Sequence, residues 1–405
     1  MTDVEVAVVG GGPAGALTAA LLARAGHEVI VFERSPAWRW RACGVFASPA
    51  TVRALGRAGI DEATLGRVAR PIPAMRVETP RGTTFRLTYG GWMPPVGFDR
   101  SGLDPALLDH ARAAGARVCS GARVEDIRLD RGAPSLTVRM PSNNIERHAA
   151  RLVIGADGGN SIVARAARVA RPARLAPRVG LTYHLADRAG DPIADARMHV
   201  FRDGYVGIAP VPGGRVNVGI VLGRSWSARL AQDGAEAVAD EIVAAIPVLA
   251  GAAGSPTDPA AWRQGARLDR VAGASPLGHR VTRRAGDGWL VVGDAAGFLD
   301  PFTGEGLHRA VVSAEVGARA ASAALRGNPR ALDAYDRAMR RRFASKDVVS
   351  WLVQVFLERP RLFEYAARRI AARMPVRETM GLVMGDLVPA SRALDPRYLG
   401  ALLRP

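Results

Sequence analysis

A glycine triplet directly after an apolar run constrains the fold of this chain more than any other feature. Residues 4–9 have the composition of a buried strand, and the turn Gly10-Gly11-Gly12-Pro13-Ala14-Gly15 follows. An Ala- and Leu-rich stretch to about residue 25 predicts a helix, and residues 27–32 predict a second strand that ends at Glu33. A strand, turn, helix and strand in this order predict part of a parallel α/β sheet.

Each part of this unit suits a dinucleotide. Gly10 permits the tight turn, Gly12 lets the backbone approach a pyrophosphate, and Gly15 lets the helix pack on the sheet. The N-terminus of the helix offers free N–H groups and a positive dipole end to phosphates. Glu33 stands where a carboxylate can accept hydrogen bonds from ribose hydroxyls. The sequence therefore predicts a dinucleotide-binding domain.

The chain is too long for one hydrophobic core, because it has 405 residues and single cores stop growing near ~250–300 residues. Two stretches, 74–92 and 179–222, alternate apolar and polar residues, as strands of a sheet with one solvated face do. We expect an α/β fold in three parts: a discontinuous Rossmann-type domain (residues 1–73, 100–178 and 268–340), an inserted, mostly antiparallel β-sheet substrate domain (74–99 and 179–267) and a C-terminal helical region (341–405).

The net charge of +17 does not indicate a nucleic-acid partner. Lys346 is the only lysine, and the remaining basic residues are arginines spread along the whole chain. No basic stripe with interleaved aromatic residues and no nucleic-acid motif is present. We therefore expect no nucleic-acid partner and interpret the excess of arginine as a generally basic surface.

Several other classes of protein are excluded or disfavoured by composition. The two cysteines, Cys43 and Cys119, cannot form a disulfide framework, and no cluster of residues has metal-ligand spacing. The acidic start of the chain is unlike a secretory signal, and the apolar stretches are shorter than the ~20 residues that span a bilayer. We expect a cytoplasmic protein without a bound metal.

Two further glycine motifs follow predicted strands. The first is Gly155-Ala156-Asp157-Gly158-Gly159, and the second is Gly293-Asp294-Ala295-Ala296-Gly297, followed by Asp300-Pro301-Phe302-Thr303-Gly304-Glu305-Gly306-Leu307. With the glycine triplet, their order and spacing across residues 4–325 resemble the FAD-dependent para-hydroxybenzoate hydroxylase-like superfamily, and within it the geranylgeranyl reductase family. The resemblance implies a fold that binds FAD, and it constrains the reaction much less.

The resemblance also implies which residues lie at FAD. It places Asp157 near the pyrophosphate, Asp294 on the ribityl chain and Val124 at the adenine. It places Arg100 near the ribityl and phosphate part, and the helix that begins near Gly306 beside the flavin, where a positive helix end stabilises an anionic reduced flavin. The full set of implied cofactor residues is Gly10, Gly12, Pro13, Ala14, Gly15, Glu33, Arg34, Arg41, Cys43, Gly44, Arg100, Val124, Asp157, Gly158, Gly293, Asp294, Pro301, Gly304, Gly306 and Leu307.

Cys43 is the one candidate catalytic residue. Geranylgeranyl reductases often carry a basic residue shortly before Cys-Gly-Gly beside the flavin, and this chain has Arg41, Cys43 and Gly44 followed by Val45. Val45 replaces the second glycine, so packing of a small buried side chain stays open as the alternative. A thiol of ordinary pKa can donate a proton at neutral pH.

The reaction is left between two interpretations. Gly297 stands where many aromatic hydroxylases carry histidine, and Gly304-Glu305-Gly306 is similar to the alkene reductases, so we favour reduction of a carbon–carbon double bond in a prenyl-like or polyene substrate. A flavin monooxygenase that hydroxylates or epoxidises with O2 is the alternative. The position of Lys346 and the run Tyr205-Val206-Gly207-Ile208-Ala209-Pro210, which lacks tryptophan, disfavour a halogenase. A flavin-binding protein without catalysis is a further alternative.

The sequence also suggests the reductant, the substrate class and a possible contact surface. No second glycine triplet follows a strand, so we expect NAD(P)H to act as a transient reductant without a domain of its own. The substrate is expected to be a hydrophobic small molecule. Residues 348–357 are apolar nearly all round, and Arg368, Arg369 and Arg373 follow. This pattern is typical of packing over the substrate domain, and a peripheral membrane contact is the alternative.

Overall fold

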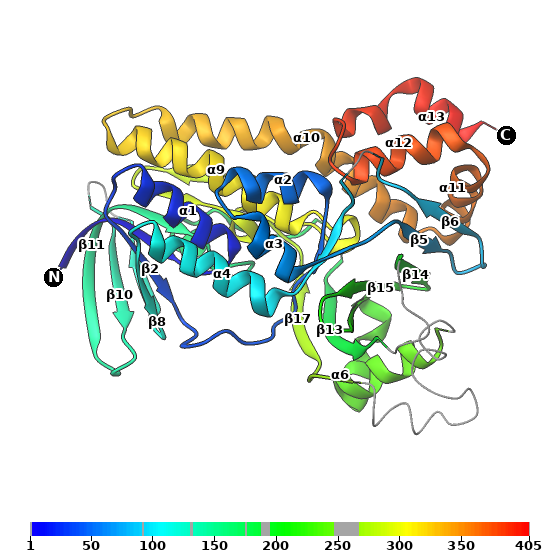
Figure 1. Cartoon of the computed structure of the whole chain (residues 1–405), viewed down its shortest axis with the longest axis horizontal. Helices are drawn as coiled ribbons and strands as arrows, with labels where there is room; N and C mark the ends of the chain where they lie inside the picture. Colours follow the sequence, from blue (N-terminus) through cyan, green and yellow to red (C-terminus); the bar gives the residue numbers. More distant parts are fainter. Residues whose placement is uncertain are drawn as a thin grey trace.

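The structure is a computed structural model that describes residues 2–90, 93–129, 133–174, 176–187, 195–246 and 267–404. Two large β-sheets form its framework, and most helices lie along one side of them (Figure 1). The chain begins at one end of the long axis and ends at the other (Figure 1). Residues 250–259, whose Gly-, Ala-, Pro- and Ser-rich sequence predicts a loop, lie outside the described residues.

The first sheet is the predicted parallel sheet. Its strand order is β19-β20-β11-β1-β2-β8, and β9 and β10 extend it through the first half of β11. Neighbours from β20 to β8 are parallel, and β19 is antiparallel to β20. The strands are β1 (Thr2–Val9), β2 (Val29–Glu33), β8 (Arg117–Ser120), β9 (Arg123–Arg128), β10 (Ser135–Arg139), β11 (Ile145–Gly155), β19 (Ala285–Gly286) and β20 (Trp289–Val291).

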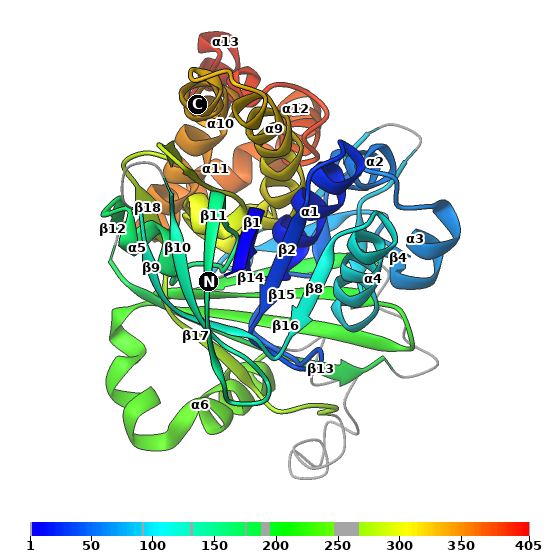
Figure 2. The same cartoon turned by 90° about the vertical axis from the view of Figure 1, so that its left-hand side faces the viewer.

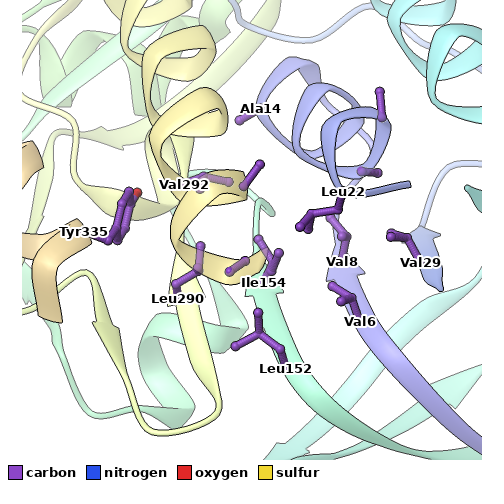
Figure 3. Close-up of a cluster of buried hydrophobic side chains, with 14 of the residues drawn as sticks. Val6, Val8, Ala14, Leu22, Val29, Leu152, Ile154, Leu290, Val292 and Tyr335 are labelled. Atoms are coloured by element: carbon purple, nitrogen blue, oxygen red, sulfur yellow. The ribbon is translucent and has the colours of Figure 1, made fainter. Parts of the chain in front are cut away.

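Helices cover one face of this sheet because their apolar stripes match its apolar strands. Val6 and Val8 of β1 pack with Leu22 and with Ile154 of β11, and Tyr335 closes the cluster from the far side (Figure 3). On the opposite face, residues of β9, β10 and a short helix form a second core. The helices are α1 (Pro13–Arg24), α4 (Arg100–Ala113), α5 (Ile162–Ala166), α9 (Gly306–Leu325) and α10 (Ala331–Leu357).

The second sheet has seven strands in the order β17-β13-β16-β15-β14-β5-β6. All neighbours are antiparallel except β14 and β5, which are parallel. The helix α6 (Ser227–Ala244) packs on one face of this sheet (Figure 2). The strands are β5 (Met75–Glu78), β6 (Thr84–Leu87), β13 (Arg178–Ala186), β14 (Ala196–Phe201), β15 (Gly204–Val211), β16 (Arg215–Leu222) and β17 (Ala272–Leu277).

The alternating pattern of this sheet does not mark a solvated face. Strands β13, β15 and β16 are buried at nearly every position, so the expectation of one exposed face is wrong for them. Some of their polar residues are paired inside the protein instead: the Asn217 amide donates to the Thr182 hydroxyl over 2.9 Å, and His184 pairs with Asp269. The buried Tyr183 hydroxyl has no partner in the described residues. Residues of all three strands also line the cavity described below, so part of the sheet faces the interior of the protein.

The structure differs from the predicted domain boundaries in three places. Strand β17 belongs to the second sheet, although residues from 268 onward were assigned to the Rossmann-type domain. Strand β7 (Val96–Phe98) pairs with β3 (Phe46–Ala47) and β4 (Ala69–Pro71) in a small separate sheet. The boundary at residue 340 falls inside α10, which runs without a break because no proline or glycine interrupts it.

The C-terminal helices and several short helices and strands complete the chain. The C-terminal helices lie over β5 and β6 (Figure 1), and prolines at the starts of α11 and α12 separate them. Among the described residues, no helix carries an apolar stretch long enough to cross a bilayer. The remaining elements are α2 (Pro49–Arg57), α3 (Glu62–Val68), β12 (Ala170–Pro172), η1 (Arg224–Trp226), β18 (His279–Val281), η2 (Gly293–Ala296), η3 (Pro301–Thr303), α11 (Pro360–Ala372), α12 (Met374–Met384), η4 (Ala390–Leu394) and α13 (Pro396–Leu403).

Candidate cofactor and substrate cavity

One large cavity, of about 1350 Å³, joins the two sheets. It is larger than the ~300–1,000 Å³ typical of a site for one small ligand. The cofactor residues implied by the sequence surround it with a single exception. Those that line it are Gly10, Gly12, Pro13, Ala14, Glu33, Arg34, Arg41, Cys43, Gly44, Arg100, Val124, Asp157, Gly158, Gly293, Asp294, Pro301, Gly304, Gly306 and Leu307.

Gly12 leaves the start of α1 open to the cavity. Gly12 is the N-cap residue of the helix, no side chain caps it within the described chain, and a Cβ added to Gly12 would meet no atom within 4 Å. Gly10 differs, because its φ is +101° and an added Cβ would lie 2.5 Å from the Ala156 carbonyl oxygen. Free backbone N–H groups therefore face a space that an anion can fill.

Gly15 does not line the cavity, so its place among the cofactor-binding residues is corrected. A Cβ on Gly15 would lie 2.0 Å from the Gly10 carbonyl oxygen. The glycine is required because the first turn of α1 packs directly against the preceding loop. Gly293 has a related function in the second motif: with φ at +59°, it brings the turn before η2 against Ala14.

Glu33 is held in position by backbone groups. The Gly11 N–H donates to Glu33 Oε2 over 2.8 Å, and the Ser35 N–H donates to Oε1 over 2.9 Å. A carboxylate has about four acceptor sites, so both oxygens retain acceptor capacity for ribose hydroxyls. Arg34, which is exposed, and Val124 line the same end of the cavity.

Asp157 carries an unsatisfied buried atom. Its Oδ2 accepts a hydrogen bond from the Ile162 N–H over 2.6 Å, whereas Oδ1 is buried without a partner in the described residues. Burial raises the pKa of this carboxyl above its usual value. A buried polar atom without a partner indicates a place where another group binds.

The Asp294 carboxylate lies at the end of β20 and faces the cavity. It accepts no hydrogen bond from any described residue, and it is an exposed residue that lines the cavity. Burial raises its pKa, and the positive charges of His279, Arg100 and Arg309 oppose that rise. A short acidic side chain in this state suits a polyol whose hydroxyls can donate to it.

The N-terminus of α9 forms another wall. Gly304 has φ at +65°, and a Cβ there would lie 2.5 Å from a ring atom of Phe46. Glu305 is the N-cap residue without a side-chain cap in the described chain, and Gly306 and Leu307 line the cavity. The helix therefore points its positive dipole end at the cavity without covering it.

Arg100 lines the cavity and also organises the segment around Cys43. Its Nε and Nη2 donate to the Asp104 carboxylate over 2.7 and 3.0 Å, and its Nη1 donates to the Gly44 carbonyl over 2.8 Å. Burial raises the pKa of the Cys43 thiol, which the nearby Arg100 partly opposes. The thiol is thus protonated at neutral pH. Neighbouring Arg41 has a buried Nε without a partner in the described residues.

Beyond these residues the cavity becomes an apolar chamber, which the sequence did not reveal. Residues of the second sheet line one side, and residues of α10, α11, α12 and α13 line the other. They include Met75, Val77, Phe85, Leu87, Met198, Tyr205, Ile220, Val221, Leu277, Phe302, Val353, Phe356, Phe363, Ile370, Met380, Tyr398 and Leu402. Apolar helical stripes in residues 348–403 were a signal for burial, but nothing in them distinguishes a chamber wall from a packed core.

Lys346 and His199 lie outside the cavity. Lys346 is buried and donates to the Asp386 carboxylate over 2.7 Å, as its position in the C-terminal helices suggested. His199 of β14 pairs with Glu78 of the neighbouring strand β5 over 3.0 Å. No group of three or more potential metal ligands occurs among the described residues.

Similar proteins agree with this arrangement. The FAD-binding domain family matches residues 3–351. The digeranylgeranylglycerophospholipid reductase 2 of Methanothermobacter thermautotrophicus is 30% identical over 329 residues, which are 79% of this chain and 78% of the relative. The menaquinone reductase of Mycolicibacterium smegmatis is 27% identical over 76% of this chain and 73% of its own.

A solved structure supports the fold. The geranylgeranyl bacteriochlorophyll reductase-like protein of Thermoplasma acidophilum has a TM-score of 0.79 and 21% identity, and the match covers 97% of this chain and 99% of that protein. The open Gly12 backbone, the unpaired Asp157 oxygen and the free Asp294 carboxylate fit the phosphates and hydroxyls of FAD. The chain therefore belongs to the FAD-binding domain family and is an FAD-dependent oxidoreductase, similar to the geranylgeranyl reductases.

Proposed function

We propose that this protein reduces a carbon–carbon double bond in a prenyl-like or polyene substrate, with NAD(P)H as the transient reductant of its FAD. The observation that carries the proposal is the apolar chamber, which is continuous with the cofactor residues. A long apolar chain can therefore lie in the same cavity as the cofactor. The relatives named as reductases of a digeranylgeranylglycerophospholipid and of menaquinone support this substrate class.

The residues present define how the cofactor would be held. The open start of α1 at Gly12 would bind the pyrophosphate, Glu33 the ribose, and Asp294 the polyol chain. Bound FAD supplies two-electron redox chemistry at this place. The N-terminus of α9 favours negative charge beside it, and the chamber walls exclude water and orient the double bond. The remaining requirement is a proton for the second carbon.

Cys43 is one protein group that can supply this proton. If Cys43 is the acid, Cys43→Ala retains normal FAD content and lowers turnover by about 100-fold, because general acids typically contribute ~10²–10⁴-fold. Its elevated pKa predicts that activity persists to higher pH than for an exposed thiol and falls once the thiol ionises. Rates measured at matched flavin occupancy test this, with Cys119→Ala, outside the cavity, as the control. Unchanged turnover would leave Cys43 with a packing role.

Anaerobic reoxidation distinguishes reduction from oxygenation. The flavin is photoreduced without oxygen and then mixed with geranylgeraniol in detergent micelles. Reoxidation without oxygen, together with a product two hydrogens heavier, is the expected result. Reoxidation only after oxygen is admitted, with a hydroxylated or epoxidised product, would establish the monooxygenase alternative. The same preparation mixed with NADPH or NADH before photoreduction tests the reductant.

Exposed apolar residues on the C-terminal helices support a peripheral membrane contact. Val348 and Trp351 lie one turn apart on α10 and are 45% and 46% exposed, although the same helix lines the chamber. The arginines that suggested a membrane contact in the sequence are engaged within the protein: Arg368 pairs with Glu364, and Arg373 donates to the Ala401 carbonyl. The exposed pair on α10 is therefore the stronger basis for this proposal.

Replacing Trp351 with alanine is expected to weaken binding to phospholipid vesicles. Removing the exposed part of an indole from a lipid contact costs about 1–2 kcal/mol, or roughly 5–30-fold in the partition coefficient. Co-sedimentation with vesicles measures the effect. Ile145→Ala, which removes an apolar residue that is 55% exposed from the first sheet, serves as the control. Equal binding of both variants and the parent protein would remove α10 from any membrane contact.

A further inference from the structure

A buried polar cluster lies in the wall of the apolar chamber. The Tyr205 hydroxyl on β15 and Asp300 Oδ1, just before η3, are 2.5 Å apart, and the Phe302 N–H donates to the same oxygen over 2.9 Å. Tyr205 is 3% exposed and Asp300 5% exposed. The Tyr205 ring contacts the Phe302 ring edge to face at 5.0 Å, and both side chains line the cavity.

The cluster is built by three parts of the fold. Arg178 at the start of β13 places its Nη1 3.3 Å from Asp300 Oδ2 and 2.5 Å from the Gln354 side-chain oxygen on α10. The other charged group near it is Glu358, 3.9 Å from Arg178 and half exposed. The second sheet, the loop that leads to α9 and the C-terminal helix therefore all meet at Asp300.

Two buried ionisable groups lie within hydrogen-bond distance of each other here. Burial raises the pKa of the Tyr205 hydroxyl and of the Asp300 carboxyl, although Arg178 opposes both rises. The Tyr205 hydroxyl donates to Asp300 Oδ1 over 2.5 Å, and the same separation lets a protonated Asp300 donate to the Tyr205 oxygen. Such a pair can hold a proton beside an apolar chamber. The proton then comes from the protein and not from water in the chamber. Arg178 can stabilise the negative charge that is left when the proton leaves.

We propose that Tyr205, backed by Asp300, donates the proton that completes reduction of the double bond. This inference rests on the proposed function and names its acid. Bound reduced FAD would supply the hydride, and with it the two electrons, for one alkene carbon. The Tyr205 O–H bond breaks as the C–H bond at the other carbon forms, and the proton of Asp300 passes to the Tyr205 oxygen. Asp300 ends as a carboxylate beside Arg178 and regains its proton from solvent between turnovers.

The pair of Tyr205 and Asp300 differs from the Cys43 thiol, because Asp300 can supply a second proton to the Tyr205 oxygen after Tyr205 has donated its own. Cys43 makes no hydrogen bond that the described residues supply, whereas Tyr205 has an acidic partner and a cation to stabilise the resulting charge. Tyr205 touches the chamber and is proposed as a catalytic residue. Asp300 and Arg178 act through it as positioning residues.

The test uses holoenzyme with photoreduced FAD, mixed anaerobically with geranylgeraniol in micelles. We expect Tyr205→Phe to slow the single-turnover reoxidation by about 100-fold and to abolish its solvent deuterium isotope effect, with FAD content unchanged. Asp300→Asn should slow it less and should remove the fall in rate at high pH. Tyr183→Phe is the matched control, because Tyr183 is a buried tyrosine of the same sheet that does not line the cavity.

A second readout does not depend on turnover. Protonated Asp300 should give an infrared carbonyl band in the parent protein that disappears at high pH and is missing in Asp300→Asn. Reoxidation of Tyr205→Phe at the parent rate with the same isotope effect, or absence of the carbonyl band at every pH, would overturn the proton-donor proposal alone. Failure of the parent protein itself to be reoxidised by geranylgeraniol would overturn the proposed function and this inference with it.

Discussion

Replacement of Gly12 by leucine is expected to abolish FAD binding while leaving the fold intact. The Gly12 backbone has φ at −69° and ψ at −179°, a conformation open to any residue, and its Cβ would project into the empty part of the cavity. The leucine would occupy the place expected for the pyrophosphate and block the N–H groups of α1. We expect the dissociation constant of FAD to rise at least about 100-fold. Steric overlap with the leucine costs ~1–3 kcal/mol, and each lost hydrogen bond costs about 1 kcal/mol more.

Two matched glycine variants separate binding from folding. Gly56→Leu places the same side chain on an exposed turn of α2, where nothing lies within 4 Å, and should bind FAD normally. Gly15→Ala should lower the thermal midpoint of the apoprotein, because the new Cβ would lie 2.0 Å from the Gly10 oxygen. Flavin absorbance after reconstitution and thermal melts of the apoproteins measure both quantities. Gly12→Leu that still reconstitutes to a yellow protein of unchanged affinity would remove this turn from the cofactor site.

Replacement of Asp294 by asparagine is expected to weaken FAD binding by about 10–150-fold. The basis is the loss of a hydrogen bond to a charged acceptor, worth about 1.5–3 kcal/mol. The effect on the apoprotein should have the opposite sign. A carboxyl whose pKa is raised by folding destabilises the native state increasingly as pH rises from its unfolded value through its folded one. Asp294→Asn should therefore melt at the same or a higher temperature at neutral pH.

Titration of the apoproteins with FAD, together with thermal melts at acidic and neutral pH, measures both effects. Asp287→Asn, an exposed aspartate outside the cavity, is the control and should change neither quantity. A variant at Asp294 that binds FAD as tightly as the parent protein would show that the carboxylate does not contact the cofactor. A lower melting temperature of the apoprotein would show that the carboxylate has a structural partner.

The cofactor half of the site was predictable because its residues act locally. Gly10 and Gly304 have positive φ, and Gly15 stands at a close backbone approach. Requirements of this kind depend on a few neighbouring residues and leave a pattern in the sequence. Even there, only the structure separated the glycines that face the cavity from Gly15, which packs against the preceding turn, because a pattern of glycines does not state which atom lies opposite each one.

The substrate half was decided by tertiary structure alone. Tyr205 and Asp300 are 95 residues apart, and Arg178 reaches Gln354 across 176 residues, so no local pattern could relate them. The chamber is walled by strands β5, β6 and β14 to β17 and by helices far along the chain. An apolar side chain has the same sequence signature whether it fills a core or lines a cavity, because the hydrophobic effect rewards removal from water in either case. The glycine motifs thus determined the fold and the cofactor, whereas the packing of distant segments determined where a substrate and its proton donor can meet.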